Sequence, residues 1–317
     1  MAKAFTIDLG ATSAKCAFFD NDKVIAKFTF STNPRENLLE NIGKEAREVA
    51  EKNNIDMDNL DFIGIAVCGI VDNAEGKVIY STNLGWRDYP VKEEMTRIFK
   101  NEKVVVLNDA KAATFGEWSK GLKKVPDSMA LFTIGTGVGG GAIFNGRLVF
   151  GDNTGLPSEP GHGGGFQDEI QCGCGLKGCI EPISSASGIE RELIAKAKVS
   201  TGPLGERYQK LGDNMHIKDI ADLFQEKDKD VIAVFYKALE PLAKIISVII
   251  HFFDVSMIVI GGGPSNLGKP LLDLLKKQAA NYVLPDFYER LNIVQASLSD
   301  LVGAWGVYEY GKAELKF

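Results

Sequence analysis

Three cysteines and one histidine, gathered in residues 157–181, constrain this chain more than any other feature. Cys172, Cys174 and Cys179 are separated by glycines, which let a short loop fold back so that the three thiolates converge. His162 precedes the first of these cysteines by ten residues. One imidazole and three thiolates form a closed tetrahedral set of the kind that holds structural zinc. The pattern therefore predicts a structural zinc loop with these four residues as ligands.

Two other interpretations of the loop cysteines stay open, namely a disulfide and unrelated thiols. A disulfide would leave one loop cysteine over and needs an oxidising compartment, whereas the N-terminal sequence has no signal-peptide pattern. The spacing Cys-x-Cys-x4-Cys in a glycine-rich loop favours a metal instead. The other two cysteines, Cys16 and Cys68, lie in apolar strands, and we expect inert buried thiols there.

Two glutamates flank the predicted ligands. Glu159 stands three residues before His162, and Glu181 stands two residues after Cys179. A chain of 317 residues rarely needs a metal to stabilise its core, so we expect the metal to stiffen a loop that carries function. The sequence therefore predicts that both carboxylates face a substrate. The alternative is a pair of solvated surface charges.

Apolar periodicity predicts an α/β chain, and the length favours two domains, with a second module starting near Ser128. We expect strands at residues 4–8, 14–20, 23–30, 61–68, 104–107, 129–134, 142–144, 147–150, 256–260 and 292–295. We expect helices at about residues 34–52, 91–100, 110–120, 189–198, 217–225, 231–253, 267–280 and 300–312.

Each half of the chain opens with a strand, a glycine turn and a second strand. The run Gly135–Gly141 satisfies the pattern Gly-x-Gly-x-x-Gly, but strand and turn residues follow it instead of a helix, which excludes a dinucleotide-binding fold. We expect the backbone N–H groups of this turn and the Thr136 hydroxyl to bind an anion. A plain tight hairpin is the alternative.

The first glycine turn reads Asp-Leu-Gly-Ala-Thr over residues 8–12. Magnesium keeps several waters and takes only one or two carboxylates, so we expect Asp8 near a phosphate-bound Mg²⁺, with water between them. We expect Thr12 to donate to a phosphate oxygen. Two such turns facing each other would hold a polyphosphate.

Charge and hydropathy exclude some partners. The formal net charge is −6 and no basic block compensates it, which disfavours nucleic-acid binding. The most apolar run, residues 245–253, is too short to span a bilayer. We therefore expect a cytoplasmic protein without a membrane partner.

Together these motifs resemble the ROK family (repressors, open reading frames and sugar kinases) of the actin-like ATPase/hexokinase superfamily, over essentially the whole chain. Residues 8–12 are similar to the family's first phosphate motif, Asp-x-Gly-Gly-Thr, with Ala11 in place of the second glycine. Residues 135–141 match its second phosphate motif, and residues 108–113 resemble its Asn-Asp-Ala-Asn-Ala-Ala. Residues 159–162 and 172–181 match the sugar-and-zinc signature, and residues 261–263 resemble the adenosine-side turn.

The resemblance implies a two-domain actin-like ATPase (ribonuclease H-like) fold with a mixed sheet in each domain. It implies a small domain over residues 1–120, joined by the C-terminal helix 300–317, and a larger domain over 121–299 with the zinc loop. These domains would close over a sugar and ATP, in a homodimer or higher homo-oligomer. The nucleotide-binding residues it implies are Asp8, Gly10, Ala11, Thr12, Gly135, Thr136, Gly137, Gly139, Gly262 and Gly263.

Repressor members of the family carry an N-terminal helix-turn-helix, whereas the phosphate motif here begins at Asp8, so we expect the kinase branch. Asp109, where a buried strand meets a helix, is the predicted general base for a sugar hydroxyl, and a helix-capping aspartate is the alternative. Fixed carboxylates and amides recognise sugar hydroxyls by directional hydrogen bonds. The substrate-binding candidates are Gly69, Asn83, Asn108, Asp109, Glu159, His162 and Glu181.

The segment 81–90 bears on which sugar is bound. It resembles the Asn-x-Gly-Trp segment of the glucokinase branch, in which Asn83 would reach a ring hydroxyl and Trp86 would offer an apolar face; a core tryptophan is the alternative. We therefore predict ATP-dependent phosphorylation of a hexose at the 6-hydroxyl, and we expect this hexose to be glucose. An N-acetylhexosamine (GlcNAc or ManNAc) is the alternative substrate. A sugar-responsive regulator without catalysis is the alternative from another class.

Overall fold

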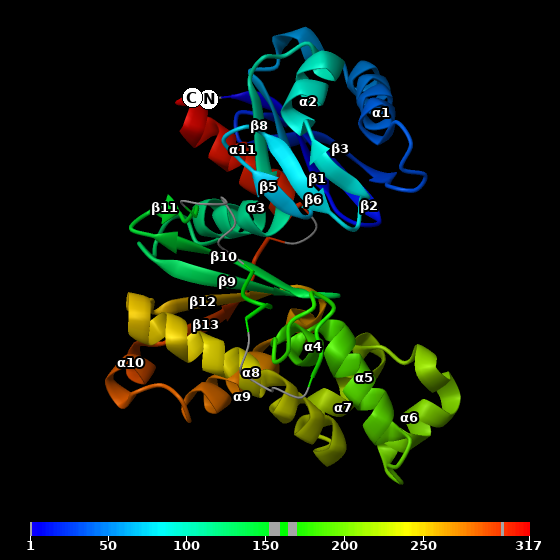
Figure 1. The fold of residues 1–317 in the computed structure, drawn as a ribbon, viewed down its shortest axis with the longest axis vertical. Helices are drawn as coiled ribbons and strands as arrows, with labels where there is room; N and C mark the ends of the chain where they lie inside the picture. The colour runs from blue at the N-terminus through cyan, green and yellow to red at the C-terminus, as the bar shows by residue number, and fades with distance from the viewer. Residues whose placement is uncertain (1, 152–158, 164–169, 299–300) are drawn as a thin grey trace. The chain divides into compact units, whose positions relative to one another are not determined.

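The computed structural model describes residues 2–151, 159–163, 170–298 and 301–317. The chain divides into two compact units, which are described separately. The first unit contains Met1–Asp127, Gly141–Ser158 and Ser297–Phe317, and the second contains Ser128–Gly140 and Glu159–Ala296. Figure 1 labels most of the helices and strands of both.

A mixed five-stranded sheet forms the centre of the first unit (Figure 1). Its order is β3-β2-β1-β4-β8, with β1 antiparallel to β2 and parallel to β4, and with β4 parallel to β8. The strands are β1 (Lys3–Leu9), β2 (Ser13–Asp20), β3 (Lys23–Ser31), β4 (Phe62–Val67) and β8 (Val104–Asn108). The carboxyl ends of the parallel strands β1, β4 and β8 therefore share one edge, where Asp8 and Asn108 stand.

Helices cover both faces of this sheet, because alternate residues of its strands are apolar on each side. The helices α1 (Leu38–Lys52) and α2 (Val91–Phe99) pack with Phe5 and Ile7 in one core. The helix α11 (Val302–Leu315) lies on the other face, where Gly64 makes room for Val307. The C-terminal helix thus completes the unit that the N-terminal strands begin.

The helix α3 (Asp109–Gly116) follows β8 directly and continues as a π-helical turn, η2 (Glu117–Gly121). It packs closely against α11, since a Cβ built on Gly306 would overlap the carbonyl oxygen of Ala112. The buried Glu117 carboxylate accepts bonds from the backbone N–H groups of Ser297 at 2.9 Å and Leu298 at 2.6 Å. These contacts hold the middle of α3 and the π-helical turn after it within the first unit.

A small antiparallel sheet of order β5-β6-β7 also belongs to the first unit. Its strands are β5 (Ile70–Asp72), β6 (Lys77–Ser81) and β7 (Trp86–Tyr89). The sequence reading assigned no element to residues 70–89. These strands are only three to five residues long, and the register between β5 and β6 is irregular. They are too short for an alternation of apolar and polar residues to be recognised in the sequence.

The second unit has a sheet of its own, with neighbours in the order β10-β9-β12-β13. The strands β9 (Met129–Ile134), β12 (Met257–Gly261) and β13 (Asn292–Gln295) are parallel, and β10 (Val138–Phe144) lies beside β9. The last residues of β10 belong to the first unit, and there Ile143 and Phe144 pair antiparallel with β11 (Arg147–Leu148).

Helices form the rest of the second unit, around one large apolar core. Side chains of the long helix α8 contribute many of its buried residues, and Asp228 caps α8 by accepting bonds from Asp230 N and Val231 N. The helices are α4 (Glu181–Ser184), α5 (Ala186–Ala197), α6 (Pro203–Leu211), α7 (Ala221–Gln225), α8 (Lys229–Phe253), α9 (Lys269–Ala279) and α10 (Pro285–Arg290). Sequence periodicity did not indicate α6 and α10, which are short and partly exposed.

Two sequence expectations about this fold were wrong. The run Gly135–Gly141 is not one turn, because β10 already begins at Val138. Gly140 and Gly141 serve close packing: a Cβ on Gly140 would lie 2.8 Å from Pro160 Cγ, and one on Gly141 would lie 2.8 Å from Thr114 Cβ. The helix expected from residue 34 begins instead at Leu38, after Asn37 in a left-handed conformation.

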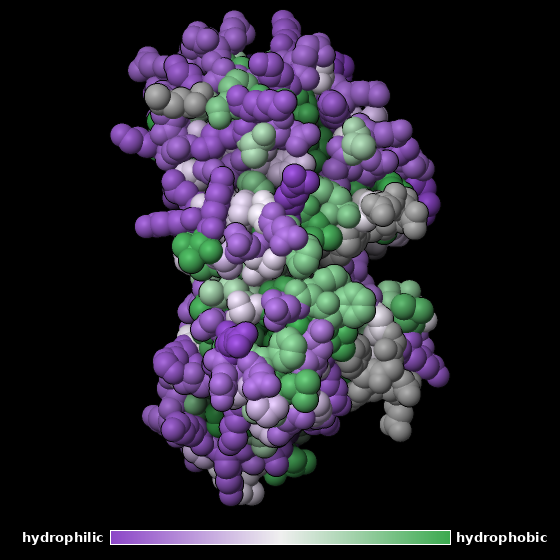
Figure 2. All heavy atoms as spheres, turned by 90° about the vertical axis from the view of Figure 1, so that its left-hand side faces the viewer, coloured by the Kyte–Doolittle hydropathy of each residue, from purple (hydrophilic) through white to green (hydrophobic). Residues whose placement is uncertain are grey.

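Figure 2 shows mostly hydrophilic residues on the face that it draws, with hydrophobic residues in scattered patches. Among the described residues, no helix is both long enough and apolar enough to cross a bilayer. The long helix α8 is excluded although much of it is apolar.

Candidate functional site

The four predicted metal ligands come together in the second unit. The nitrogen or sulfur atoms that His162, Cys172, Cys174 and Cys179 could offer to an ion all lie within 4.8 Å of one another. Cys172 Sγ lies 3.7 Å from His162 Nδ1, and Cys174 Sγ lies 3.7 Å from Cys179 Sγ. The loop closes on itself, since Cys172 N donates to the Leu176 carbonyl at 2.8 Å. The structure thus forms a cluster that could hold a metal ion.

The other ring nitrogen of His162 faces the two predicted carboxylates. His162 Nε2 lies 4.0 Å from Glu159 Oε2 and 4.0 Å from Glu181 Oε1. Because Nδ1 points to the cysteine cluster, one imidazole connects the cluster to both acids. Their side chains are 49% and 29% exposed, so Glu159 is the more open to solvent and Glu181 is partly enclosed.

Glu181 also contacts the glycine turn between β9 and β10, which the sequence did not reveal. Its Oε2 accepts a bond from Val138 N at 3.0 Å. A Cβ built on Gly137 would overlap the same oxygen. Ala186 N, in the helix that follows, donates to the Gly135 carbonyl at 2.8 Å. The predicted sugar-binding acid and the predicted phosphate turn are therefore joined within one unit.

Gly262, from the predicted adenosine-side turn, lies beside the same glycine turn. It has φ 87°, and a Cβ there would lie 2.6 Å from the Ile134 carbonyl carbon. Only glycine adopts this conformation at so close an approach without strain. The structure thus brings Gly262 next to the residue that precedes the Gly135–Gly137 turn.

In the first unit, Asn108 and Asp109 stand where β8 ends and α3 begins. Asn108 is the N-cap of α3, because its Oδ1 accepts a bond from Lys111 N at 3.1 Å. Asp109 Oδ1 accepts bonds from Ala110 N at 2.9 Å and from Asn108 Nδ2 at 3.0 Å. Asn108 Nδ2 also donates to the Gly69 carbonyl at 3.0 Å. Three of the predicted substrate-binding residues are thereby linked.

The carboxylate of Asp8 lies at the carboxyl end of β1, against the first turn of α11. A Cβ on Gly303 would lie 2.5 Å from Asp8 Oδ2. Burial raises the pKa of Asp8 to about 6, and the charge of Lys15 partly opposes this effect. The adjoining turn is fixed by Gly10 N, which donates to the Ser13 carbonyl at 3.0 Å, and by Thr32 N, which donates to the Thr12 carbonyl at 3.2 Å.

The segment around Asn83 and Trp86 is less enclosed. Asn83 is exposed in the turn between β6 and β7. Trp86 is partly buried against the apolar core of the first unit and stacks on Tyr89, with ring centroids 4.3 Å apart. The interpretation as a core tryptophan is therefore correct in part.

The comparisons with known proteins agree with the motifs. The ROK family model matches residues 4–313. The chain belongs to the ROK family. It is 31% identical over 313 residues to a glucokinase of Halalkalibacterium halodurans, covering 95% of this chain and 92% of that protein. It is 25% identical to an N-acetylmannosamine kinase of Haemophilus influenzae, covering 90% and 88% of the two chains.

A solved structure supports the same assignment. The crystal structure of a ROK family glucokinase from Streptomyces griseus, in complex with glucose and AMPPNP, matches with a TM-score of 0.82 at 26% identity. The match covers 98% of this chain and 99% of that one. The predicted family is therefore confirmed, and so is the actin-like ATPase fold with mixed sheets.

Burial makes the two thiols of this ROK protein outside the loop unreactive, as predicted. It raises the pKa of Cys68 to about 11, with a further contribution from the charge of Asp109. It raises the pKa of Cys16 still further. Because the thiolate is the reactive form of cysteine, neither residue is a candidate nucleophile.

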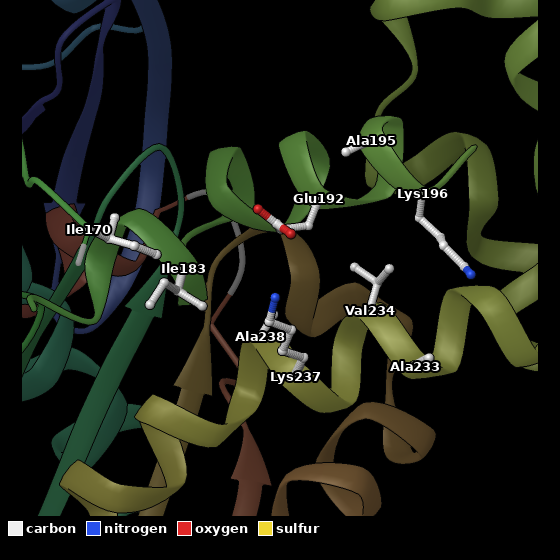
Figure 3. A pocket seen from close by; sticks show the side chains of 9 residues that line it. All are labelled: Ile170, Ile183, Glu192, Ala195, Lys196, Ala233, Val234, Lys237 and Ala238. Atoms are coloured by element: carbon white, nitrogen blue, oxygen red, sulfur yellow. The ribbon is translucent and has the colours of Figure 1, made fainter. Parts of the chain in front are cut away.

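A separate pocket of about 350 Å³ lies in the second unit between α5 and α8 (Figure 3). Among the described residues that line it, none is a predicted site residue. Its floor is apolar, and one of its charged residues, Lys196, pairs with Asp230 at 3.2 Å. The lining residues are Ile170, Ile183, Glu192, Ala195, Lys196, Ala233, Val234, Lys237 and Ala238.

Sequence reasoning missed Gly303 and Val138 as neighbours of site residues. Gly303 lies 295 positions after Asp8 in the chain, and Val138 lies 43 positions before Glu181. Neither position belongs to a motif that indicates such a partner. The available signals were Gly303, one of three glycines in α11, and the place of Val138 within the run Gly135–Gly141.

Proposed function

We propose that this protein is an ATP-dependent hexose kinase that phosphorylates the 6-hydroxyl, with glucose as its preferred substrate. The observation that carries the proposal is the imidazole of His162 placed 4.0 Å from the carboxylates of both Glu159 and Glu181, in a chain of the ROK family. The named glucokinase relatives and the glucose-bound neighbour support glucose as the substrate.

Asp109 is the general base in this proposal. Phosphoryl transfer needs positioning, charge neutralisation and a group that takes the acceptor's proton. The bonds that Asp109 Oδ1 accepts from Ala110 N and Asn108 Nδ2 fix the orientation of the carboxylate. The N-cap role belongs to Asn108, which supports a different role for Asp109. Asp109 then orients the 6-hydroxyl and accepts its proton as the new O–P bond forms.

The hexose hydroxyls are bound by Glu159, His162 and Glu181, together with Asn83, Asn108 and the backbone of Gly69. Carboxylates accept directional hydrogen bonds from hydroxyl groups, and a histidine donates through one ring nitrogen. Glu159 and Glu181 stand at the same 4.0 Å distance from His162 Nε2, which supports a shared role in holding one polar ligand.

Zinc is the metal we assign to the cysteine cluster. Zinc–sulfur and zinc–nitrogen bonds of about 2.3 and 2.0 Å give tetrahedral edges of about 3.8 Å between sulfurs and about 3.5 Å between sulfur and nitrogen. In this structure the Cys174 Sγ–Cys179 Sγ and Cys172 Sγ–His162 Nδ1 separations are both 3.7 Å. When bound, zinc fixes the tautomer and direction of His162, and with it the two acids.

The nucleotide phosphates are assigned to the two glycine turns. Backbone N–H groups of Thr136, Gly137 and Val138 and the hydroxyls of Thr12 and Thr136 are the donors. Gly10, Ala11, Gly135 and Gly139 are close in sequence, and Gly262 and Gly263 are on the adenosine side. Mg²⁺, when bound, neutralises phosphate charge, and the buried carboxylate of Asp8 is the residue that would hold its waters.

A coupled ADP-release assay with a panel of sugars tests this function. We expect kcat/KM to be highest for glucose, compared with mannose, fructose, N-acetylglucosamine and N-acetylmannosamine at equal ATP. The N-acetylmannosamine kinase relative makes an N-acetylated hexose the second candidate. A tenfold preference for an N-acetylated sugar, about 1.4 kcal/mol in transition-state binding, would replace glucose but keep the kinase. No sugar-dependent turnover with any hexose would favour a non-catalytic regulator.

A further inference from the structure

The Glu181 carboxylate occupies the position where the glycine turn of residues 135–137 would hold an anion. Its Oε2 accepts a bond from Val138 N–H at 3.0 Å, and a Cβ on Gly137 would overlap the same oxygen. Backbone N–H groups at such turns are donors for phosphate oxygens in proteins. The carboxylate of Glu181 therefore accepts the hydrogen bond of Val138 N–H, a donor that a nucleotide phosphate would need.

The backbone of Glu181 is held by two hydrogen bonds. Glu181 N donates to the Gly161 carbonyl at 3.1 Å, and the Glu181 carbonyl accepts from Ser185 N at 3.1 Å. Glu181 Oε1 lies 4.0 Å from His162 Nε2. Because the backbone is held, a change of partner by the carboxylate requires only a rotation of its own side chain. It can thus exchange the turn for a ligand without moving the loop.

We propose that Glu181 gates the glycine turn for the nucleotide. Without hexose, the carboxylate occupies Val138 N–H and repels a phosphate. A bound hexose donates its hydroxyls to Glu181, draws the carboxylate off the turn and frees the N–H group. This inference rests on the proposed function, which supplies both ligands. Hexose and nucleotide then bind with positive linkage, and each tightens the other by the same factor.

Isothermal calorimetry of Mg²⁺–AMPPNP binding, with and without saturating glucose, measures this linkage as a ratio of two Kd values. We expect glucose to tighten AMPPNP binding to the wild-type protein at least about fivefold, the lower end of usual coupling. Glu181→Gln keeps the shape of the side chain but removes its charge. We expect this variant to bind AMPPNP more tightly than wild type when glucose is absent, with a linkage ratio near one.

Two further variants separate the gate from the sugar contact. Glu159→Gln removes the other carboxylate at 4.0 Å from His162 Nε2, so we expect weaker glucose binding but a wild-type linkage ratio once glucose is saturating. Gly137→Ala keeps the Glu181 carboxylate but displaces its oxygen from the turn. We expect a ratio near one for this variant too, whether or not the added methyl group weakens AMPPNP binding in both conditions.

The outcomes test the gate separately from the proposed kinase function. A wild-type linkage ratio in both Glu181→Gln and Gly137→Ala, with zinc content showing that each variant is folded, overturns the gate. So does a wild-type protein that binds AMPPNP equally with and without glucose, although the kinase proposal survives that result. A wild-type protein that binds no AMPPNP in either condition refutes the proposed function as well.

Discussion

Replacing Asp8 by asparagine is expected to stabilise the first unit at neutral pH and to remove most of the activity. Burial raises the pKa of Asp8 from an ordinary 3.8 to about 6. A carboxyl group with a raised folded-state pKa stabilises the fold only in its protonated form, at pH below the unfolded value. That contribution is lost as the pH rises from about 4 through about 6, so the ionised Asp8 destabilises the protein at pH 7.5.

The magnitude follows from the two pKa values. The difference between 3.8 and about 6, at about 1.4 kcal/mol per pH unit, amounts to about 3 kcal/mol at pH 7.5. At pH 5 only about half of this cost is present, because much of the folded-state group is still protonated. Asparagine has the same shape and no charge, so we expect Asp8→Asn to gain roughly these amounts in free energy of unfolding.

Tryptophan fluorescence during urea unfolding measures this effect selectively. All three tryptophans, Trp86, Trp118 and Trp305, belong to the first unit, as Asp8 does. Wild type and variant are compared at pH 5 and pH 7.5, and ADP release is measured on the same samples. A variant that is no more stable than wild type at pH 7.5, or whose advantage is equal at both pH values, would refute the reasoning.

Three further predictions concern the base, the metal and the packing of α3. Asp109→Asn is expected to keep glucose binding, measured by calorimetry, and to lower kcat by ~10²–10⁴-fold; a loss smaller than about threefold would mean that another residue is the base. Elemental analysis is expected to find one zinc per chain in wild type and none in Cys174→Ala, whose KM for glucose should rise, and full activity in zinc-free protein would contradict this. Gly306→Ala is expected to cost about 1–3 kcal/mol in urea unfolding, because its Cβ would overlap the Ala112 carbonyl oxygen, and an unchanged midpoint would show that α3 and α11 can separate at little cost.

Local chemistry allowed the sequence to predict much of this protein. The convergence of His162 and the three loop cysteines could be predicted because the cysteines lie within eight residues, and the glycines between them let the loop fold back on itself. The end of β8 and the start of α3 could be predicted at Asn108 and Asp109, since a capping side chain acts on backbone groups only a few residues away. The pattern of buried strands likewise predicted the central strands of both sheets.

Tertiary structure decided the features that arise where segments distant in the chain come together. The sequence suggested a turn at Gly140 and Gly141, yet both lie in the strand β10. Their lack of a side chain makes room for Pro160 and Thr114, which come from other segments. The raised pKa of Asp8 and the bond from Val138 N–H to Glu181 have the same origin. Burial and close packing are set by the whole fold, so no local pattern of residue types could report them.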